Sequence, residues 1–164
     1  MKNWLASALL GLASGLTTTA FTQTIPKELV ETWTIVSITR ETDGKVTDLY
    51  GPNPQGRRMI DADGHFSYII TRADLPKITS NNRATATPEE YKAIVQGSLA
   101  FFGTITVNEA EKTYTIHTEV CTDPNWVGLD RKVSYTIDGD ELTTISADAS
   151  VDYKPVRVVF KRAK

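Results

Sequence analysis

Residue types that commonly carry chemistry are scarce in this sequence. It contains one cysteine, Cys121, and two histidines, His65 and His117, among 164 residues. A single cysteine excludes an intramolecular disulfide framework and any all-cysteine metal site, and we expect Cys121 to be either buried and inert or paired with another chain. The two histidines lie far apart and no Asp/His/Cys cluster has ligand spacing, so we expect no metal site.

The sequence also lacks an excess of positive or negative charge, and it lacks the common cofactor motifs. The chain has 18 Lys+Arg against 20 Asp+Glu, and a nucleic-acid-binding domain normally shows a basic surplus, so we expect no nucleic-acid partner. There is no nucleophile elbow, phosphate-binding loop or dinucleotide glycine motif, and we therefore expect no cofactor. No repeat or linker divides the chain, and its length suits one domain.

Hydrophobic runs are short, and the only notable one lies at the start. Lys2 gives a positive beginning, residues 4–16 carry no charge, and residues 17–20 are small. This is the pattern of a secretory signal peptide cleaved after about Ala20, and its apolar part is shorter than the roughly 20 residues that span a bilayer. We predict a signal peptide over 1–20, one domain over 21–164, no stable membrane anchor after cleavage and a secreted or periplasmic location. A retained anchor is the alternative.

What the sequence does contain is a series of short segments rich in β-branched and aromatic residues. Turn pairs such as Asp43-Gly44 and Asp63-Gly64 separate several of them. The eight predicted strands are Thr32–Arg40, Arg57–Asp61, His65–Thr71, Ala100–Val107, Lys112–Glu119, Arg131–Ile137, Glu141–Ser146 and Val156–Lys161. We predict an all-β fold, an eight-stranded antiparallel up-and-down barrel, because closure removes the exposed strand edges.

The segment between the third and fourth predicted strands interrupts this series. Its first part has no periodicity and is expected to be a long loop. Thr87 as N-cap, Pro88 at the first position and Glu90 at the third then predict one short helix that ends near Gly97. Its apolar face consists of Tyr91, Ile94, Val95 and Leu99. We expect the helix to plug one barrel end or to pack on the barrel wall.

Several segments, taken in order, resemble the lipocalin-like domain family, a bacterial and fungal branch of the calycin-type barrels. They are Thr32-Trp33, Tyr50-Gly51 with Pro54 and Gly56, Asp63-Gly64-His65-Phe66-Ser67, Thr87-Pro88-Glu89-Glu90-Tyr91-Lys92, Phe102-Gly103-Thr104, Pro124-Asn125-Trp126-Val127-Gly128, and Gly139-Asp140 with Leu142. The resemblance runs from about Leu29 to Lys161. It implies an up-and-down barrel, often with an internal cavity, and no shared catalytic motif.

The resemblance also gives Trp33 a structural role. It implies that Trp33 closes the base of the barrel under a late basic residue, Arg157 or Arg162, whose charge lies over the ring. The sequence departs from the family pattern at one position, because Glu31 stands where such first strands have glycine. The barrel end at Glu31 is therefore expected to be built differently.

Two strands carry the candidate polar groups of an interior site. His117 and Glu119 share one strand face and Tyr114 shares the other with Ile116 and Thr118. If the first face points inward, His117 beside Glu119 is a candidate general base; if it points outward, both are solvated. Arg131 shares a face with Val133 and Tyr135, so it either clamps a carboxylate or enolate inside the barrel or lies at its rim.

Two further places contribute candidates for ligand binding. Ser67 and Tyr68 lie on opposite strand faces, and Tyr68 is a candidate if its face points inward. In the loop Pro124–Gly128, Trp126 is expected either to stack on a ligand or to cover the barrel end. Asn125 is expected either to bind the ligand or to satisfy turn amides. The predicted ligand-binding set is Tyr68, His117, Asn125, Trp126, Arg131 and Tyr135, with His117, Glu119 and Arg131 as catalytic candidates.

Three functions fit these features. The first is an exported barrel that binds a small, largely apolar molecule in its interior. The second is a cofactor-free isomerase or cyclase acting on a lipid- or polyketide-like substrate in the same cavity. The third is a structural or interaction module of the cell envelope with a solid core. We favour binding over catalysis, because no catalytic motif is present.

Overall fold

A computed structural model describes residues 24–146 and 155–164, and the predicted signal peptide, residues 1–20, lies outside these described residues. The elements in chain order are β1 (Thr32–Thr42), β2 (Lys45–Asp48), β3 (Gln55–Ile60), β4 (His65–Thr71), η1 (Arg83–Thr85), α1 (Pro88–Gln96), β5 (Ser98–Asn108), β6 (Thr113–Cys121), η2 (Pro124–Trp126), β7 (Asp130–Asp138), β8 (Glu141–Ser146) and β9 (Val156–Arg162).

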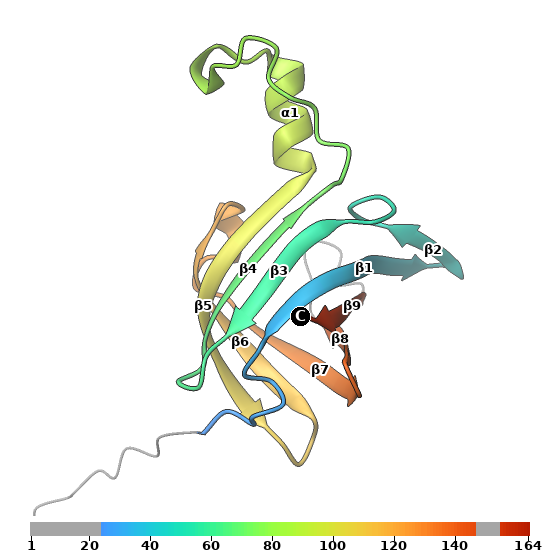
Figure 1. Cartoon of the computed structure of the whole chain (residues 1–164), viewed down its shortest axis with the longest axis vertical. Helices are drawn as coiled ribbons and strands as arrows, with labels where there is room; N and C mark the ends of the chain where they lie inside the picture. Colours follow the sequence, from blue (N-terminus) through green and yellow to red (C-terminus); the bar gives the residue numbers. More distant parts are fainter. Residues whose placement is uncertain (1–23, 147–154) are drawn as a thin grey trace, which may run out of the picture.

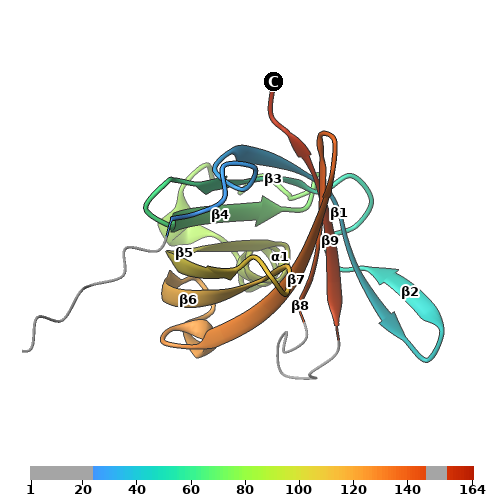
Figure 2. The same cartoon turned by 90° about the horizontal axis from the view of Figure 1, so that it is seen from below.

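Eight of the strands close into a barrel. Each of β3 to β8 pairs antiparallel with the next strand along the chain, β3 pairs with β1, and the additional pairing of β1 with β9 completes the circle. Figures 1 and 2 show β1 beside β9 where the barrel closes. The eight-stranded antiparallel barrel predicted from the sequence is confirmed.

The remaining strand, β2, was not predicted, and it changes the number of strands that precede the helix. It is a four-residue extension, Lys45–Asp48, paired only with the far end of β1 across the Asp43-Gly44 turn. All four of its residues are exposed, so it has no apolar face to mark it in the sequence. Counting β2, the helix lies between β4 and β5 rather than between the third and fourth strands.

Alternating side chains divide the barrel into an inner and an outer face. On β4, Phe66, Tyr68 and Ile70 are buried, whereas Ile69 is exposed. Inward residues from all eight barrel strands form one core cluster. This alternation places every second residue of a strand in the interior, which is where a site would form.

One end of the barrel is closed by tightly packed side chains. Trp33 and Leu29 are fully buried there, and the indole N–H of Trp33 donates to the carbonyl of Leu29 (3.4 Å). The guanidinium of Arg162 lies 4.7 Å from the centre of the Trp33 ring, which confirms the predicted cation–π contact and selects Arg162 over Arg157. Glu31, at the position of the family glycine, forms a 2.6 Å ion pair with Arg162. The substitution thus adds a charged partner to this barrel end.

The helix has the predicted caps but not the predicted packing. The Thr87 hydroxyl accepts from the Glu90 N–H while the Glu90 carboxylate accepts from the Thr87 N–H, and Pro88 is the first helical residue. No residue of α1 is buried, and Val95 on its apolar face is 74% exposed. The helix projects beyond the ends of β4 and β5 (Figure 1), so the expectation that it plugs the barrel or packs on its wall was wrong. Among the described residues, no helix has the length and apolar character needed to cross a membrane.

Candidate functional site

The barrel is hollow in the half away from Trp33. A cavity of about 310 Å³ lies between the strands and extends to the end where Tyr50, Gln96 and Ser146 are found. Most of its wall is aliphatic or aromatic, with Ile70, Phe101, Ile116, Val133 and Phe160 among its residues. Volumes of this order, with mainly apolar walls and a few placed polar groups, are typical of small-molecule sites.

Arg131 is one of the polar groups in this wall. It is 6% exposed and stacks on Trp126, with its guanidinium carbon 3.9 Å from the ring centre and 5.3 Å from that of Phe101. Burial lowers the pKa of Arg131, because the charged guanidinium loses its hydration. Its Nε and Nη2 atoms are buried and have no hydrogen-bond partner in the described part of the chain. The inward orientation expected from Val133 and Tyr135 is confirmed.

Arg58 is a second buried cation, which the sequence analysis missed. It is 4% exposed, donates from Nη1 to the Tyr114 hydroxyl (2.6 Å), and lies 4.5 Å from the centre of the Phe160 ring. Because β3 and β6 are separated by two strands, its side chain reaches across the interior. As in Arg131, Nε and Nη2 are buried and have no hydrogen-bond partner within residues 24–146 and 155–164.

A signal for Arg58 was present in the sequence. Arg57 and Arg58 are adjacent, so alternation alone does not decide which of them points inward. In the hairpin of β3 and β4, Arg58 lies directly opposite Tyr68, and opposite residues share a face. The aromatic face of Phe66 and Tyr68 is the inner one, so the register from the Asp63-Gly64 turn would have placed Arg58 inside.

Tyrosines supply further polar atoms of the cavity, which Arg40, Gln96, Thr144 and Ser146 also line. Tyr68 lines it, and burial raises the pKa of its phenol, so this hydroxyl stays protonated. The Tyr68 hydroxyl has no hydrogen-bond partner among the described residues. Tyr50 lies at the cavity end, where burial also raises its pKa. These phenols are neutral and can only donate or accept hydrogen bonds.

Of the other predicted ligand-binding residues, Trp126 lines the cavity and packs edge-on against Phe101. Tyr135 is buried but lies outside the cavity wall, where its ring contacts that of Tyr114. Asn125 is exposed and does not line the cavity, and its backbone N–H donates to the Asp123 carboxylate (3.0 Å). The turn is thus capped by Asp123, not by Asn125.

His117 and Glu119 lie on the outer face of β6. Both are exposed, and His117 Nδ1 is 2.8 Å from a carboxylate oxygen of Asp130, also exposed. The apolar Tyr114 and Ile116 take the inner face instead, as burial of the more apolar face requires. The structure therefore separates His117 and Glu119 from Arg131. The hypothesis that His117 acts as a base inside the cavity was wrong, because its side chain lies on the outer face.

Cys121, the last residue of β6, is half-buried. Burial raises the pKa of its thiol, and the Asp123 N–H donates to its sulfur (3.3 Å). A raised pKa keeps the thiol protonated and weakly reactive.

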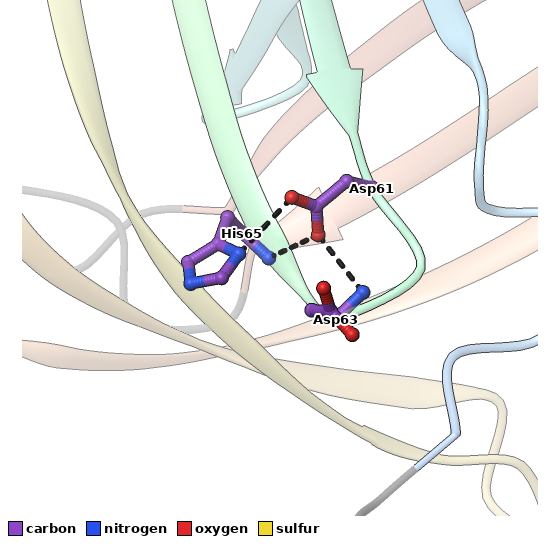
Figure 3. Close-up of polar contacts among 3 residues, drawn as sticks. All are labelled: Asp61, Asp63 and His65. Atoms are coloured by element: carbon purple, nitrogen blue, oxygen red, sulfur yellow. Dashed lines mark hydrogen bonds and ion pairs between the residues drawn. The ribbon is translucent and has the colours of Figure 1, made fainter.

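Asp61, Asp63 and His65 form an exposed cluster at the turn between β3 and β4 (Figure 3), and their possible ligand atoms all lie within 4.8 Å of one another. The expectation that no Asp/His/Cys cluster has ligand spacing was therefore wrong. One Asp61 oxygen accepts from the backbone N–H groups of Asp63 and His65 at 2.9 Å each, and the other is 3.0 Å from His65 Nδ1. Although burial acts in the opposite direction, these bonds lower the pKa of Asp61. An aspartate that binds the amides of its own turn is a device for fixing that turn, and we assign the cluster to the hairpin.

The closed antiparallel barrel and its internal cavity define a calycin-type barrel. The sequence model of the lipocalin-like domain matches residues 30–156, which is most of the chain, and the chain therefore belongs to the lipocalin-like domain family. No curated protein matches the chain. The resemblance seen in the sequence is thus confirmed at the level of the family.

Proposed function

We propose that this chain is an exported protein that binds a small, largely apolar molecule inside the barrel. The cavity carries the proposal, because about 310 Å³ of space with mainly apolar walls has room for roughly ten water volumes of about 30 Å³ each. A structural module with a solid core has no need of such a space. Export rests on the signal-peptide pattern of residues 1–20.

The other hypothesis for this cavity, an isomerase or cyclase, lacks a base. The described residues that line the cavity include arginines and tyrosines but no histidine and no carboxylate. Arginine is protonated at all ordinary pH values, and the Tyr68 phenol is held neutral. Such groups bind and orient a molecule, and they do not readily remove a proton from it.

The binding proposal is tested with N-phenylnaphthylamine, an uncharged apolar dye that fluoresces in apolar surroundings. We expect saturable binding to the wild-type protein. In Ile70→Phe, the new ring fills part of the cavity, and the affinity should fall by at least about tenfold, which corresponds to about 1.4 kcal/mol. Ile70 is buried in the cavity wall, whereas its neighbour Ile69 is 56% exposed on the outer face.

Ile69→Phe is therefore the matched control and should bind the dye like the wild type. Absence of saturable binding by the wild-type protein, or an equal loss in both variants, would overturn the proposal. Export is tested separately, by N-terminal sequencing of the protein recovered outside the cytoplasm, which should begin near residue 21.

A further inference from the structure

Arg58 and Arg131 are buried cations that lack a carboxylate partner. Both line the cavity, and neither forms an ion pair with any Asp or Glu of residues 24–146 and 155–164. Charged side chains are almost never buried without a partner, since they lose their hydration. Two such cations in one small cavity therefore indicate that a negative charge belongs there.

The unpaired atoms are the same in both side chains. Nε and Nη2 lie along one edge of a guanidinium, and in Arg58 and Arg131 both atoms are buried with no hydrogen-bond partner among the residues that the structure describes. On the surface of this protein, Arg72 uses that edge to hold Asp74, with Nε and Nη2 each 2.8 Å from one carboxylate oxygen. The two cavity arginines thus keep free the edge that binds a carboxylate through two hydrogen bonds.

Aromatic side chains keep both guanidinium groups in place. Arg58 lies over Phe160 and donates to Tyr114, and Arg131 lies over Trp126. Tyr114, Phe160 and Trp126 line the same cavity as the two guanidinium groups. Stacking on a ring fixes the plane of a guanidinium and leaves its edge available, which lowers the ordering cost of binding.

We infer that the molecule bound in this cavity is an amphipathic carboxylic acid, whose carboxylate accepts hydrogen bonds from the free edges of Arg58 and Arg131. This inference rests on the proposed binding function and specifies its ligand class. The Tyr68 hydroxyl, buried and without a hydrogen-bond partner in the described ranges, is a further donor for the same headgroup. The apolar part of the acid lies against the aliphatic and aromatic wall, toward Leu49 and Leu99 at the cavity end.

The first experiment compares ligands that differ only in the headgroup. Decanoate and decanol are used to displace N-phenylnaphthylamine from the wild-type protein, with acetate as a headgroup without a chain. We expect decanoate to bind at least tenfold more tightly than decanol, and acetate not to displace the dye at the same concentrations. Equal affinities for decanoate and decanol would overturn the inference, as would displacement by acetate at decanoate concentrations.

The second experiment removes the cations. Arg58→Met and Arg131→Met should each lower the affinity for decanoate at least tenfold and change that for decanol less than threefold. Arg57→Met and Lys132→Met are matched controls, because these neighbours are exposed on the outer face. Both controls should retain the affinity of the wild type. An equal loss of decanoate and decanol in the cavity variants would overturn the inference.

The dye separates this inference from the proposed function. If the wild-type protein binds N-phenylnaphthylamine but shows no preference for decanoate, the cavity binds apolar molecules and the carboxylate inference alone fails. If it binds neither the dye nor decanoate nor decanol, the proposed function fails and the inference fails with it. Retained dye binding also shows that each variant is folded, and the wild-type headgroup comparison needs no variant.

Discussion

The two halves of the barrel contain the same pair of side chains in different electrostatic surroundings. At the closed end, Arg162 lies 4.7 Å from the centre of the Trp33 ring and pairs with Glu31 and Asp140 at 2.6 and 3.3 Å. In the cavity, Arg131 lies 3.9 Å from the centre of the Trp126 ring, and no carboxylate of the described residues pairs with it. The stacking is shared, and the difference lies in what neutralises the charge.

This difference separates a structural role from a binding role. Arg162 is part-exposed and its charge is balanced within the fold, so its contacts stabilise the barrel. Arg131 is buried and its charge is not balanced, so the folded protein is less stable than one with an apolar side chain there. Residues that lower the stability of the folded protein are common at sites that bind a ligand. The following predictions test this comparison.

The largest effect is expected from the two tryptophans. Trp33 is fully buried at the closed end, so Trp33→Ala should lower the free energy of unfolding by about 3–5 kcal/mol through lost burial and the cavity left behind. Trp126 is only half-buried, so Trp126→Ala should cost less, roughly 2 kcal/mol or below. Urea denaturation of both variants measures the two losses.

Dye binding also distinguishes the two tryptophans. Trp126→Ala should lower the affinity for N-phenylnaphthylamine, because the ring is part of the cavity wall. A Trp126→Ala variant that loses as much stability as Trp33→Ala, with unchanged dye affinity, would contradict the division into a structural half and a binding half.

The second effect concerns the arginines themselves. Arg162→Met should lower the free energy of unfolding by about 1–2 kcal/mol, since it removes a ring contact and two ion pairs that solvent partly screens. Arg131→Met should change it by less than about 1 kcal/mol or raise it, because a methionine needs no hydration and still contacts Trp126. Both values come from urea denaturation without ligand. A larger loss in Arg131→Met than in Arg162→Met would show that the cavity cation is structural.

Much of this comparison could be anticipated from the sequence. Turn pairs and alternation located the eight barrel strands, and the alternation of Val133 and Tyr135 put Arg131 on the inner face, with the barrel rim as the alternative. Trp33 with a late arginine followed from the family resemblance. For the strands and for Arg131, a local pattern with period two or a short turn motif was enough, because burial of one face is what sets the register of a strand.

What was missed depends on pairing across strands. β2 has four exposed residues, so only its hydrogen bonds to β1 make it a strand. Arg58 is decided by its position opposite Tyr68, and His117 by the greater burial gained when Tyr114 and Ile116 point inward. The helix carries the predicted caps, yet none of its residues is buried, which its amphipathic pattern does not reveal.

The smallest effect is expected in the helix and the loop before it, which lie outside both halves of the barrel. Hydrogen bonds from the Thr79 N–H, the Thr87 N–H and the Thr79 hydroxyl lower the pKa of Glu90 below its ordinary 4.5, although burial acts weakly in the opposite direction. A carboxyl group whose pKa is lowered in the folded state stabilises that state at pH values above its ordinary pKa. This contribution is lost as the pH falls through the folded pKa.

The Thr79 amide proton shift should therefore titrate with a midpoint below 4.5 in NMR spectra. The titration should vanish in Glu90→Gln and persist in Glu89→Gln, an exposed neighbour in the same turn. The indole signal of Trp33 should not change over this pH range, since the closed end of the barrel shares no contact with Glu90. A midpoint at or above 4.5 would contradict the lowered pKa of Glu90. A parallel change at Trp33 would show that the helix is coupled to the barrel core.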